Sequence, residues 1–317
     1  MKFNVDDLVA KKLVTKKTYT EGPFAGLSVL KYKNNVFWDN LWHTDQRLLE
    51  CRGMVVDSED NVIIWPFTKI FNRFENGKDL PMDKQICVPR KVNGFMAAAG
   101  AYNGDWIVST TGTLDSDFAH MAKEKIDFYQ NWTLDCRDMK QLTLIFEICD
   151  DSDPHIVHEH PGAYLIGARN LVTGKMLSEK QLDGLASGTN WKRPEWDICS
   201  FGDVVIASQA VNHEGFVVRD VDTGELLLKI KSPHYLTKKF LMRGGDNKWD
   251  MIWDNPQNAK QRIDEEYYDL LDHIREYYSK DVWAAMDSQK RRQVVEDYFT
   301  IEDMFDRDSR FYVGVPK

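Results

Sequence analysis

The sequence has little of what marks secreted, membrane-spanning or disulfide-stabilised proteins. Its five cysteines (Cys51, Cys87, Cys136, Cys149 and Cys199) form no C-x-x-C pair, which argues against a disulfide framework or a zinc ribbon. No window approaches about 18 consecutive apolar residues, the length that a membrane-spanning helix needs. Residues 1 to 17 also lack the apolar stretch of a signal peptide. We therefore expect a cytoplasmic protein with reduced thiols and no membrane contact.

An excess of positive charge is missing as well. The net charge of −9 over 317 residues argues against a protein that coats nucleic acid by bulk electrostatic attraction. It leaves room for a local basic groove, because cationic side chains do cluster. They lie near the start (Lys11, Lys12, Lys16, Lys17) and again further on (Lys229, Lys231, Lys238, Lys239, Arg243).

Short apolar or alternating runs dominate residues 24 to 231 and predict antiparallel strands joined by hairpins. The strongest turn signal is Asn103-Gly104, between "GFMAAAGAY" and "WIVSTTG". Two other hairpins are expected in "GMVVDSEDNVIIWPF" and "GFVVRDVDTGELLLKIKS", further strands in "LTLIFEI" and "AYLIGARNLV", and a helix around residues 115 to 130.

The pattern changes after Gly244-Gly245. Residues 257 to 308 place apolar side chains at helical spacing among charges, which predicts two or three amphipathic helices. We therefore predict an α+β fold, with an antiparallel-sheet domain over residues 1–243 and a small all-helical domain over residues 244–317.

Lys91, in "PRKVNGFMAAAG", is a candidate nucleophile. A lysine needs a lowered pKa for this role, because at its reference value only roughly one ammonium in a thousand is neutral near pH 7. Lys229 and Lys231 are candidate neighbours, since they alternate on one predicted strand and share a face. On the spacing K-x-x-G alone, an ordinary lysine before a strand is the favoured interpretation, because this spacing occurs by chance in many proteins.

Other charged residues lie in or beside apolar strands. Glu147 and Glu214 would be costly to bury without a cation or hydrogen-bond partner, so both are site candidates, although a strand-end carboxylate facing water is the alternative. Arg52 and Lys69 fit contacts with phosphate, or charges that protect an edge strand. A third group contains His155, His158 and His160 among Asp150, Asp151, Asp153 and Glu159; its spacing matches no common zinc site.

The order of these segments is more informative than any one of them. The series "CRG", "PFTKIFN", "KVNG", "FE", "EGFVV" and "KIKS" runs over residues 45 to 240. This series resembles the motifs of the covalent nucleotidyltransferases, the superfamily of polynucleotide ligases and mRNA capping enzymes. It is most similar to the phage-type RNA ligase 1 family, ATP-dependent enzymes that reseal broken tRNA.

The resemblance implies a role for each matching residue. Lys91 corresponds to the nucleophile that forms a lysine–AMP intermediate, and Lys229 and Lys231 to the pair that holds the α-phosphate during catalysis. Glu214 corresponds to the metal carboxylate, for Mg²⁺ with Mn²⁺ as an alternative. The remaining ATP-binding positions are Arg52, Lys69, Phe71, Gly94, Phe146 and Glu147.

The implied activity is the joining of 5′-phosphate and 3′-hydroxyl ends of RNA, with broken tRNA as a possible substrate, by a monomer in the cytosol of a phage-infected or bacterial cell. A ligase acting on DNA ends or on both polymers is one alternative, and a nucleotide- or RNA-binding relative without ligation is the other. The chain departs from the family pattern K-x-D-G-S at Asn93 and Phe95, and from S-K-G-S at Thr111.

The C-terminal helices take the place where this family carries a helical domain implicated in choosing RNA. Tyr267-Tyr268 and Tyr277-Tyr278 are candidates for stacking on bases, or for packing within the domain.

Overall fold

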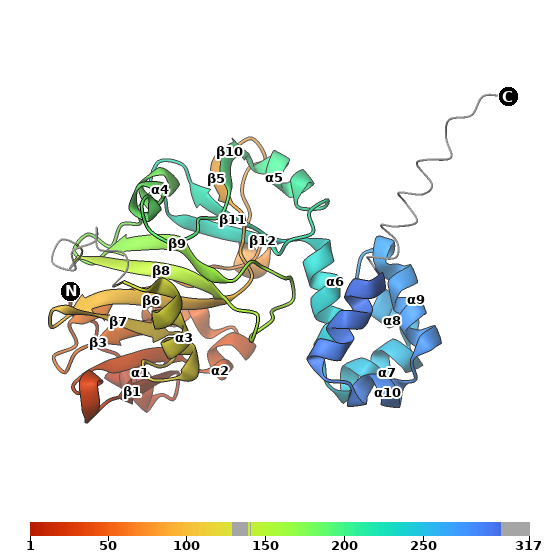
Figure 1. Ribbon diagram of the computed structural model, residues 1–317, viewed down its shortest axis with the longest axis horizontal. Helices are drawn as coiled ribbons and strands as arrows, with labels where there is room; N and C mark the ends of the chain where they lie inside the picture. Colours follow the sequence, from red (N-terminus) through yellow and green to blue (C-terminus); the bar gives the residue numbers. More distant parts are fainter. Residues whose placement is uncertain (129–138, 140, 299–317) are drawn as a thin grey trace. The chain divides into compact units, whose positions relative to one another are not determined.

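The computed structural model describes residues 1–128, 139 and 141–298 and shows a mixed fold of helices and antiparallel sheets (Figure 1). The strands are β1 (Val14–Thr18), β2 (Ser28–Tyr32), β3 (Arg52–Val56), β4 (Val62–Ile64), β5 (Gln85–Pro89), β6 (Phe95–Tyr102), β7 (Asp105–Thr110), β8 (Leu142–Cys149), β9 (Gly162–Asn170), β10 (Trp196–Ser200), β11 (Gly215–Asp220) and β12 (Leu226–Lys231). The helices are α1 (Asp6–Ala10), α2 (Asn34–Trp38), α3 (Asp117–Ile126), α4 (Glu179–Ala186), α5 (Phe201–Ala207), α6 (Pro233–Met242), α7 (Asp246–Asp254), α8 (Pro256–Lys260), α9 (Tyr268–Tyr277) and α10 (Lys280–Ala285). Residues 288–298 are helical too. The predicted α+β class with a helical C-terminal region is confirmed.

The strands form three four-stranded antiparallel sheets within the described residues. Their orders are β1-β2-β3-β4, β10-β5-β11-β12 and β7-β6-β8-β9. The hairpin predicted at Asn103-Gly104 is confirmed: both residues have positive φ, 51° and 85°, and Tyr102 pairs with Asp105 across the turn. A two-residue turn with two positive φ values matches the twist of the flanking strands, which explains why this dipeptide was informative.

The chain divides into two compact units. The first contains residues 1–153, 159–207 and 216–230, and the second contains residues 154–158, 208–215 and the chain from Lys231 onward. The domain boundary between residues 243 and 244 stays a prediction. The C-terminal helices start with α6, at Pro233, which is before the segment that the sequence pattern predicted as helical. Seven of its residues are buried, including the polar His234, Thr237 and Lys238, so α6 lacks the two-faced pattern that marks an amphipathic helix.

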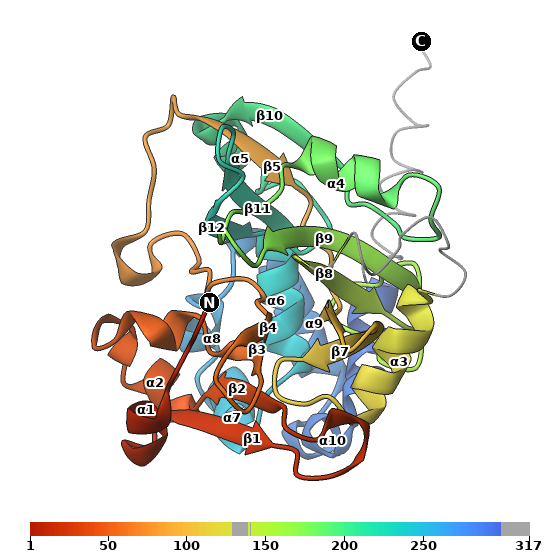
Figure 2. The same cartoon turned by 90° about the vertical axis from the view of Figure 1, so that its left-hand side faces the viewer.

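The first unit builds its cores between sheets and helices. Helices α3 and α4 lie on sheet β7-β6-β8-β9, where Ala122 and Leu182 are buried with Phe146 (Figures 1 and 2). Another cluster joins Val29 and Val55 of the N-terminal sheet to Ala98 of β6. Strand β6 therefore packs in two apolar clusters, and the loop that precedes it ends at a firmly packed strand.

The second unit has its own apolar core. Trp249, Leu271 and Trp283 are buried there, together with Ile156. Ser232 caps α6, because its hydroxyl accepts a hydrogen bond from the Tyr235 N–H at 3.1 Å. Residues 299–308 of the predicted C-terminal helices lie outside the described residues, as do residues 129–130 of the predicted helix that contains α3.

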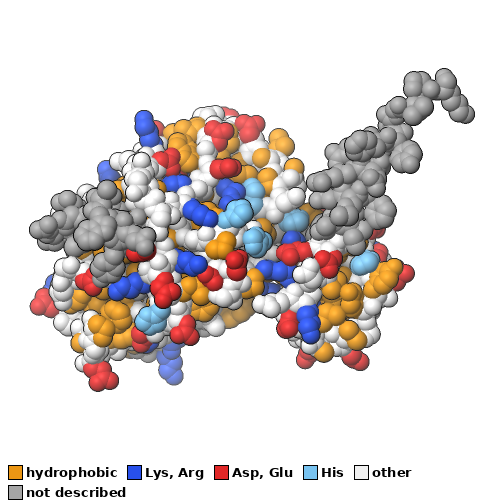
Figure 3. All heavy atoms as spheres, viewed as in Figure 1, with side chains coloured by type: hydrophobic (Ala, Val, Ile, Leu, Met, Phe, Trp, Pro, Cys, Tyr) orange, Lys and Arg blue, Asp and Glu red, His pale blue; other side chains and the backbone are white. Residues whose placement is uncertain are grey.

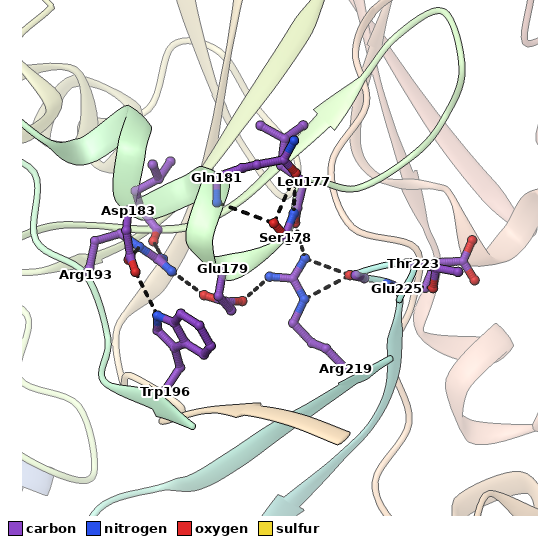
Figure 4. A network of polar contacts seen from close by, with 12 residues as sticks. Leu177, Ser178, Glu179, Gln181, Asp183, Arg193, Trp196, Arg219, Thr223 and Glu225 are labelled. Carbon is purple, nitrogen blue, oxygen red and sulfur yellow. Dashed lines mark hydrogen bonds and ion pairs between the residues drawn. The ribbon is translucent and has the colours of Figure 1, made fainter. Parts of the chain in front are cut away.

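A buried charge network ties α4 to its surroundings in the first unit (Figure 4). The Glu179 carboxylate is ion-paired with both Arg193 and Arg219, and the side chains of Glu179 and Arg219 are only 1% and 2% exposed. Arg219 also donates to the carbonyl oxygens of Leu177 and Gly224. Because every charge has several partners, the network fixes the position of α4 in spite of the desolvation that burial imposes.

Charges elsewhere are mixed in sign. On the face in Figure 3, Lys and Arg side chains alternate with Asp and Glu side chains, and no large region of one sign is present. Among the described residues, no helix has both the length and the apolar content needed to cross a membrane.

Candidate active site

The loop between β5 and β6 carries Lys91, and the neighbouring strand β8 carries Glu147. The Gly94 N–H donates to Glu147 Oε1 at 3.0 Å, and Met96 pairs with Glu147 in the β6–β8 ladder. A Cβ atom at Gly94 would lie 2.2 Å from the Ile148 carbonyl oxygen, so this close approach requires glycine. The buried Glu147 is therefore bonded to Gly94, which follows Lys91 by three residues.

The Lys91 loop is anchored on both sides of the lysine. Arg90 donates to Glu159 through Nη1 and Nη2 at 2.8 and 2.9 Å, and the Asn93 N–H donates to the same carboxylate at 3.2 Å. Burial alone would lower the pKa of Arg90, but the hydrogen bonds and charge of Glu159 outweigh it and raise that pKa. Lys91 itself is partly buried, with Nζ 3.5 Å from the Val92 carbonyl oxygen.

Lys69, Phe71 and Lys229 come together beside Arg52. The segment after Phe71 pairs with β12: the Lys229 N–H donates to the Phe71 carbonyl at 3.0 Å, and the Arg73 N–H to the Lys229 carbonyl at 2.9 Å. Lys69 Nζ lies 4.5 Å from the centre of the Phe71 ring. These contacts bring Phe71 of "KIFN" next to Lys229 of "KIKS", although about 160 residues separate the two segments.

Burial and charge oppose each other in this group. Burial lowers the pKa of Lys69; Glu75, 3.8 Å away, opposes this, and Arg52 adds to the lowering. For Glu75, burial would raise the pKa, but hydrogen bonds from Asn72 and the charges of Lys69 and Lys229 lower it. The result is a site with more cations than anions, which suits a phosphate-bearing ligand.

Glu214 and Lys231 lie in the second unit. The Lys231 ammonium is 3.1 Å from Glu214 Oε1, and the two side chains are 17% and 3% exposed. Ser232 holds the two segments together, because its N–H donates to the Glu214 carbonyl at 3.0 Å and its hydroxyl to the His213 carbonyl at 2.6 Å. Apart from the place of Ser232 at the end of "KIKS", no sequence pattern predicted this role.

Phe146 has surroundings different from those of Glu147. It is fully buried and packs edge-on against Trp191, with ring centres 5.0 Å apart, inside the core beneath α3 and α4. Successive strand residues point to opposite faces, so the side chain next to a site residue is directed into the core.

The structure shows the surroundings of the three residues that depart from the family pattern, Asn93, Phe95 and Thr111. Asn93 is buried, and its carbonyl is 4.0 Å from the Cys149 sulfur. Phe95 packs edge-on against Phe118 at 4.9 Å between ring centres. Thr111 precedes Gly112, where an added Cβ would lie 3.1 Å from Cδ of Lys31.

The histidine-rich segment is divided between the units: residues 154–158 belong to the second and Glu159 to the first. Across residues 1–128, 139 and 141–298, no group of three His, Cys, Asp or Glu side chains is arranged to hold a metal ion. The described cysteines are free, and Cys136 lies outside the described residues. Burial raises the pKa of the Cys149 thiol to about 12, with Glu147 and Glu159 adding to the effect, so this thiol stays protonated.

The fold is shared with solved polynucleotide ligases. Two structures of an archaeal ATP-dependent RNA ligase align with TM-scores of 0.56 and 0.55, each at 15% identity over 92% of this chain and 74% of the ligase. A putative ATP-dependent DNA ligase from Aquifex aeolicus aligns with a TM-score of 0.53, at 18% identity over 97% of this chain and 76% of that chain. These likenesses define the fold as that of the nucleotidyltransferase ligases.

The family follows from the sequence. The model of the RNA ligase family matches residues 50–240, and the chain therefore belongs to that family. None of the curated proteins matches it. The family expected from the ordered motifs is confirmed, and with it the expectation that the chain is a ligase.

Proposed function

We propose that this protein joins RNA ends through a covalent lysine–AMP intermediate formed on Lys91. The observation that carries the proposal is the anchored loop: Lys91 lies between two contacts to Glu159, and the loop ends at Gly94, whose N–H binds the buried Glu147. A nucleophile needs this kind of fixed geometry, because effective molarity depends on holding the reacting atoms in line.

In the first step, the neutral amine of Lys91 attacks the α-phosphorus of ATP. The new N–P bond forms as the bond to pyrophosphate breaks, and the amine loses a proton. AMP then passes to the 5′-phosphate of RNA, giving a 5′–5′ pyrophosphate, and a 3′-hydroxyl displaces AMP to form the phosphodiester. Lys229 and Lys231 neutralise the charge that develops on the α-phosphate.

Arg52, Lys69 and Phe71 would bind ATP in this scheme. The excess of cations around Lys69 supports phosphate binding, and the Lys69 ammonium lies over one face of the buried Phe71 ring. Glu147 would bind the ribose. We propose a packing role for Phe146, since it is enclosed by the core against Trp191.

A divalent metal fits Glu214. Mg²⁺ takes one or two carboxylates and completes its shell with water and phosphate oxygens. One buried carboxylate such as that of Glu214, which is ion-paired with Lys231, would therefore be sufficient beside a triphosphate. Such an ion, with Mn²⁺ as an alternative, would neutralise phosphate charge when bound.

The biological setting is also a proposal. The family match supports RNA as the substrate. We propose that the joined ends are a 5′-phosphate and a 3′-hydroxyl, in the repair of broken tRNA or another RNA, and that the protein is a cytoplasmic monomer of phage or bacterial origin. DNA ends are a second candidate, favoured by the similarity to the Aquifex aeolicus protein. The helical domain from residue 244 would then select the substrate.

The test is covalent labelling with α-labelled ATP and Mg²⁺. The wild-type protein should gain a label that Lys91→Ala lacks, whereas Lys175→Ala, an exposed lysine of the first unit, should keep it. A label that persists on Lys91→Ala would show that the assigned nucleophile is wrong. Ligation of matched 5′-phosphorylated RNA and DNA strands would then separate the two substrates.

A further inference from the structure

An open groove crosses β1 and β2 of the N-terminal sheet, at a volume of about 590 Å³. We call it the β1–β2 groove; its lining includes Thr15, Lys17, Lys31, Lys33, Asn34 and Gly112. All of these residues belong to the first unit, so the groove is part of one compact body.

The positive charge in the groove is only partly neutralised. Lys17 is paired with Asp115 at 2.6 Å. Lys31 and Lys33 are exposed and make no ion pair with any residue that the structure describes. Lys16, on the opposite face of β1, is ion-paired with Asp6 at 3.1 Å and with Asp60 at 3.0 Å. The two faces of this strand therefore differ in charge, and the groove face suits an anion.

The groove leads toward the proposed ATP-binding residues. Lys31 pairs with Thr15 of β1 on one side and with Arg52 of β3 on the other. Thr15 and Lys31 are regular cross-strand partners and share a face of the sheet. The register between β2 and β3 shifts between Leu30 and Lys31, and Arg52 is the partner of Lys31 at this irregularity. Arg52 is close enough to Lys69 to lower the pKa of that lysine. A ligand in the groove would thus lie next to the ATP-binding group.

An exposed aromatic pair lies on α2, the helix whose first residue, Asn34, lines the groove. Trp38 and Phe37 are 74% and 47% exposed, with ring centres 5.1 Å apart. Trp38 follows the lining residue Asn34 by four positions on α2, so the two side chains share a helix face. A basic track with an accessible indole at its side is typical of surfaces that bind single-stranded nucleic acid.

From these observations we infer that the β1–β2 groove binds the single-stranded RNA next to the end being joined. Lys31 and Lys33 contact backbone phosphates, and Trp38 stacks on a base. This inference rests on the proposed function for the identity of the polymer. Three features support the groove as a binding site independently of that function: its lysines that are unpaired among the described residues, the pairing of Lys31 with Arg52, and the exposed aromatic pair on α2.

The test is a titration of a short, labelled, 5′-phosphorylated single-stranded RNA at several salt concentrations. The double variant Lys31→Ser/Lys33→Ser should bind more weakly, and its slope of log affinity against log salt should fall by about 1.4, or about 0.7 for each lost phosphate contact. Trp38→Ala should weaken binding by about 5- to 150-fold at constant slope, the effect of losing one stacked base.

The matched control is Lys175→Ser/Lys180→Ser, which removes two exposed charges from the first unit outside the groove. Equal effects of the two double variants, or wild-type affinity and slope in the groove variant, would overturn the inference. The inference would also be overturned if the groove variant changed only the ATP concentration needed to label Lys91, because Lys31 and Lys33 would then bind ATP rather than RNA.

The two proposals fail in different ways. RNA binding does not require adenylation, so groove-dependent binding without labelling of Lys91 would reject the proposed function alone. Labelling with groove-independent RNA binding would reject the groove alone. Thermal unfolding of each variant shows whether it is folded; the three substituted side chains are exposed, so we expect no change in midpoint.

Discussion

Arg90 and Glu159 form a bidentate ion pair, with nitrogen–oxygen distances of 2.8 and 2.9 Å. The Glu159 side chain is only 4% exposed, so little water reaches its carboxylate. A bidentate pair between charged groups is also stronger than a hydrogen bond between neutral groups. The same carboxylate accepts the Asn93 N–H, which places Lys91 and Val92 between two anchored residues. Glu159 thus positions the proposed nucleophile through its contacts with Arg90 and with the backbone of Asn93.

Glu159→Gln should slow the labelling of Lys91 by about 10-fold in single-turnover experiments. The amide keeps the shape of the carboxylate but removes its charge, so the loop loses rigidity, and small misplacements of a nucleophile reduce rates strongly. The ATP concentration for half-maximal labelling should stay the same, because Glu159 has no proposed contact with ATP.

Glu195→Gln is the control for this change. The Glu195 carbonyl accepts the Arg90 N–H at 2.8 Å, while its side chain is exposed, so the backbone contact survives the substitution. We expect a wild-type labelling rate. If Glu159→Gln also labelled at that rate, the positioning role of Glu159 would be wrong.

Gly94→Ala should reduce labelling by about 100-fold. The new methyl group would lie 2.2 Å from the Ile148 carbonyl oxygen, and backbone on both sides must move to relieve this contact. That movement breaks the 3.0 Å hydrogen bond between the Gly94 N–H and Glu147.

Gly184→Ala provides the comparison, measured by labelling and by urea unfolding. No atom outside its own helix lies within 4 Å of the added methyl, and Gly184 is inside α4. Alanine should therefore stabilise the fold by roughly 0.5–1 kcal/mol and leave labelling unchanged. Similar losses of labelling in both variants would contradict the close-approach argument.

Local patterns in the sequence predicted the strands and the Asn103 hairpin because these depend on neighbouring residues. The order of the motifs predicted the family because chance does not reproduce six segments in sequence. Long-range contacts were not readable. Glu159 was grouped with nearby histidines, and nothing in its spacing pointed to Arg90, 69 residues away. Helix α6 was not predicted for the same reason. Its buried polar residues break the amphipathic pattern, and a partner such as Glu296 for Lys238 lies far away in the sequence.

The Glu179 network should be essential for stability. Glu179→Gln leaves the guanidinium groups of Arg193 and Arg219 without their shared counter-charge, and Arg219 is almost completely buried. Breaking a buried pair of this kind typically costs about 3–5 kcal/mol. Urea unfolding should show a loss of this size at neutral pH.

Glu124→Gln controls for the loss of one carboxylate, since Glu124 is an exposed residue of α3. Its unfolding free energy should remain within about 0.5 kcal/mol of wild type, as for most surface substitutions. A Glu179→Gln protein as stable as this control would show that the network contributes nothing to the fold.

The buried His234 should make the protein less stable in mild acid. It is 8% exposed, and burial, together with the charge of Lys238, lowers its pKa from 6.5 to about 4. Between these values the unfolded chain binds a proton that the folded protein excludes, so stability falls as the pH decreases from about 6.5 to about 4. The shift corresponds to a loss of about 3 kcal/mol at most.

In urea unfolding at pH 7.5 and pH 5, His234→Gln should lose less stability on acidification than wild type. His120→Gln, which changes an exposed histidine of α3, should match wild type. Carboxylates titrate in all three proteins, so the difference between them isolates the histidine, and identical pH dependence in the wild type and His234→Gln would rule out its part in acid sensitivity.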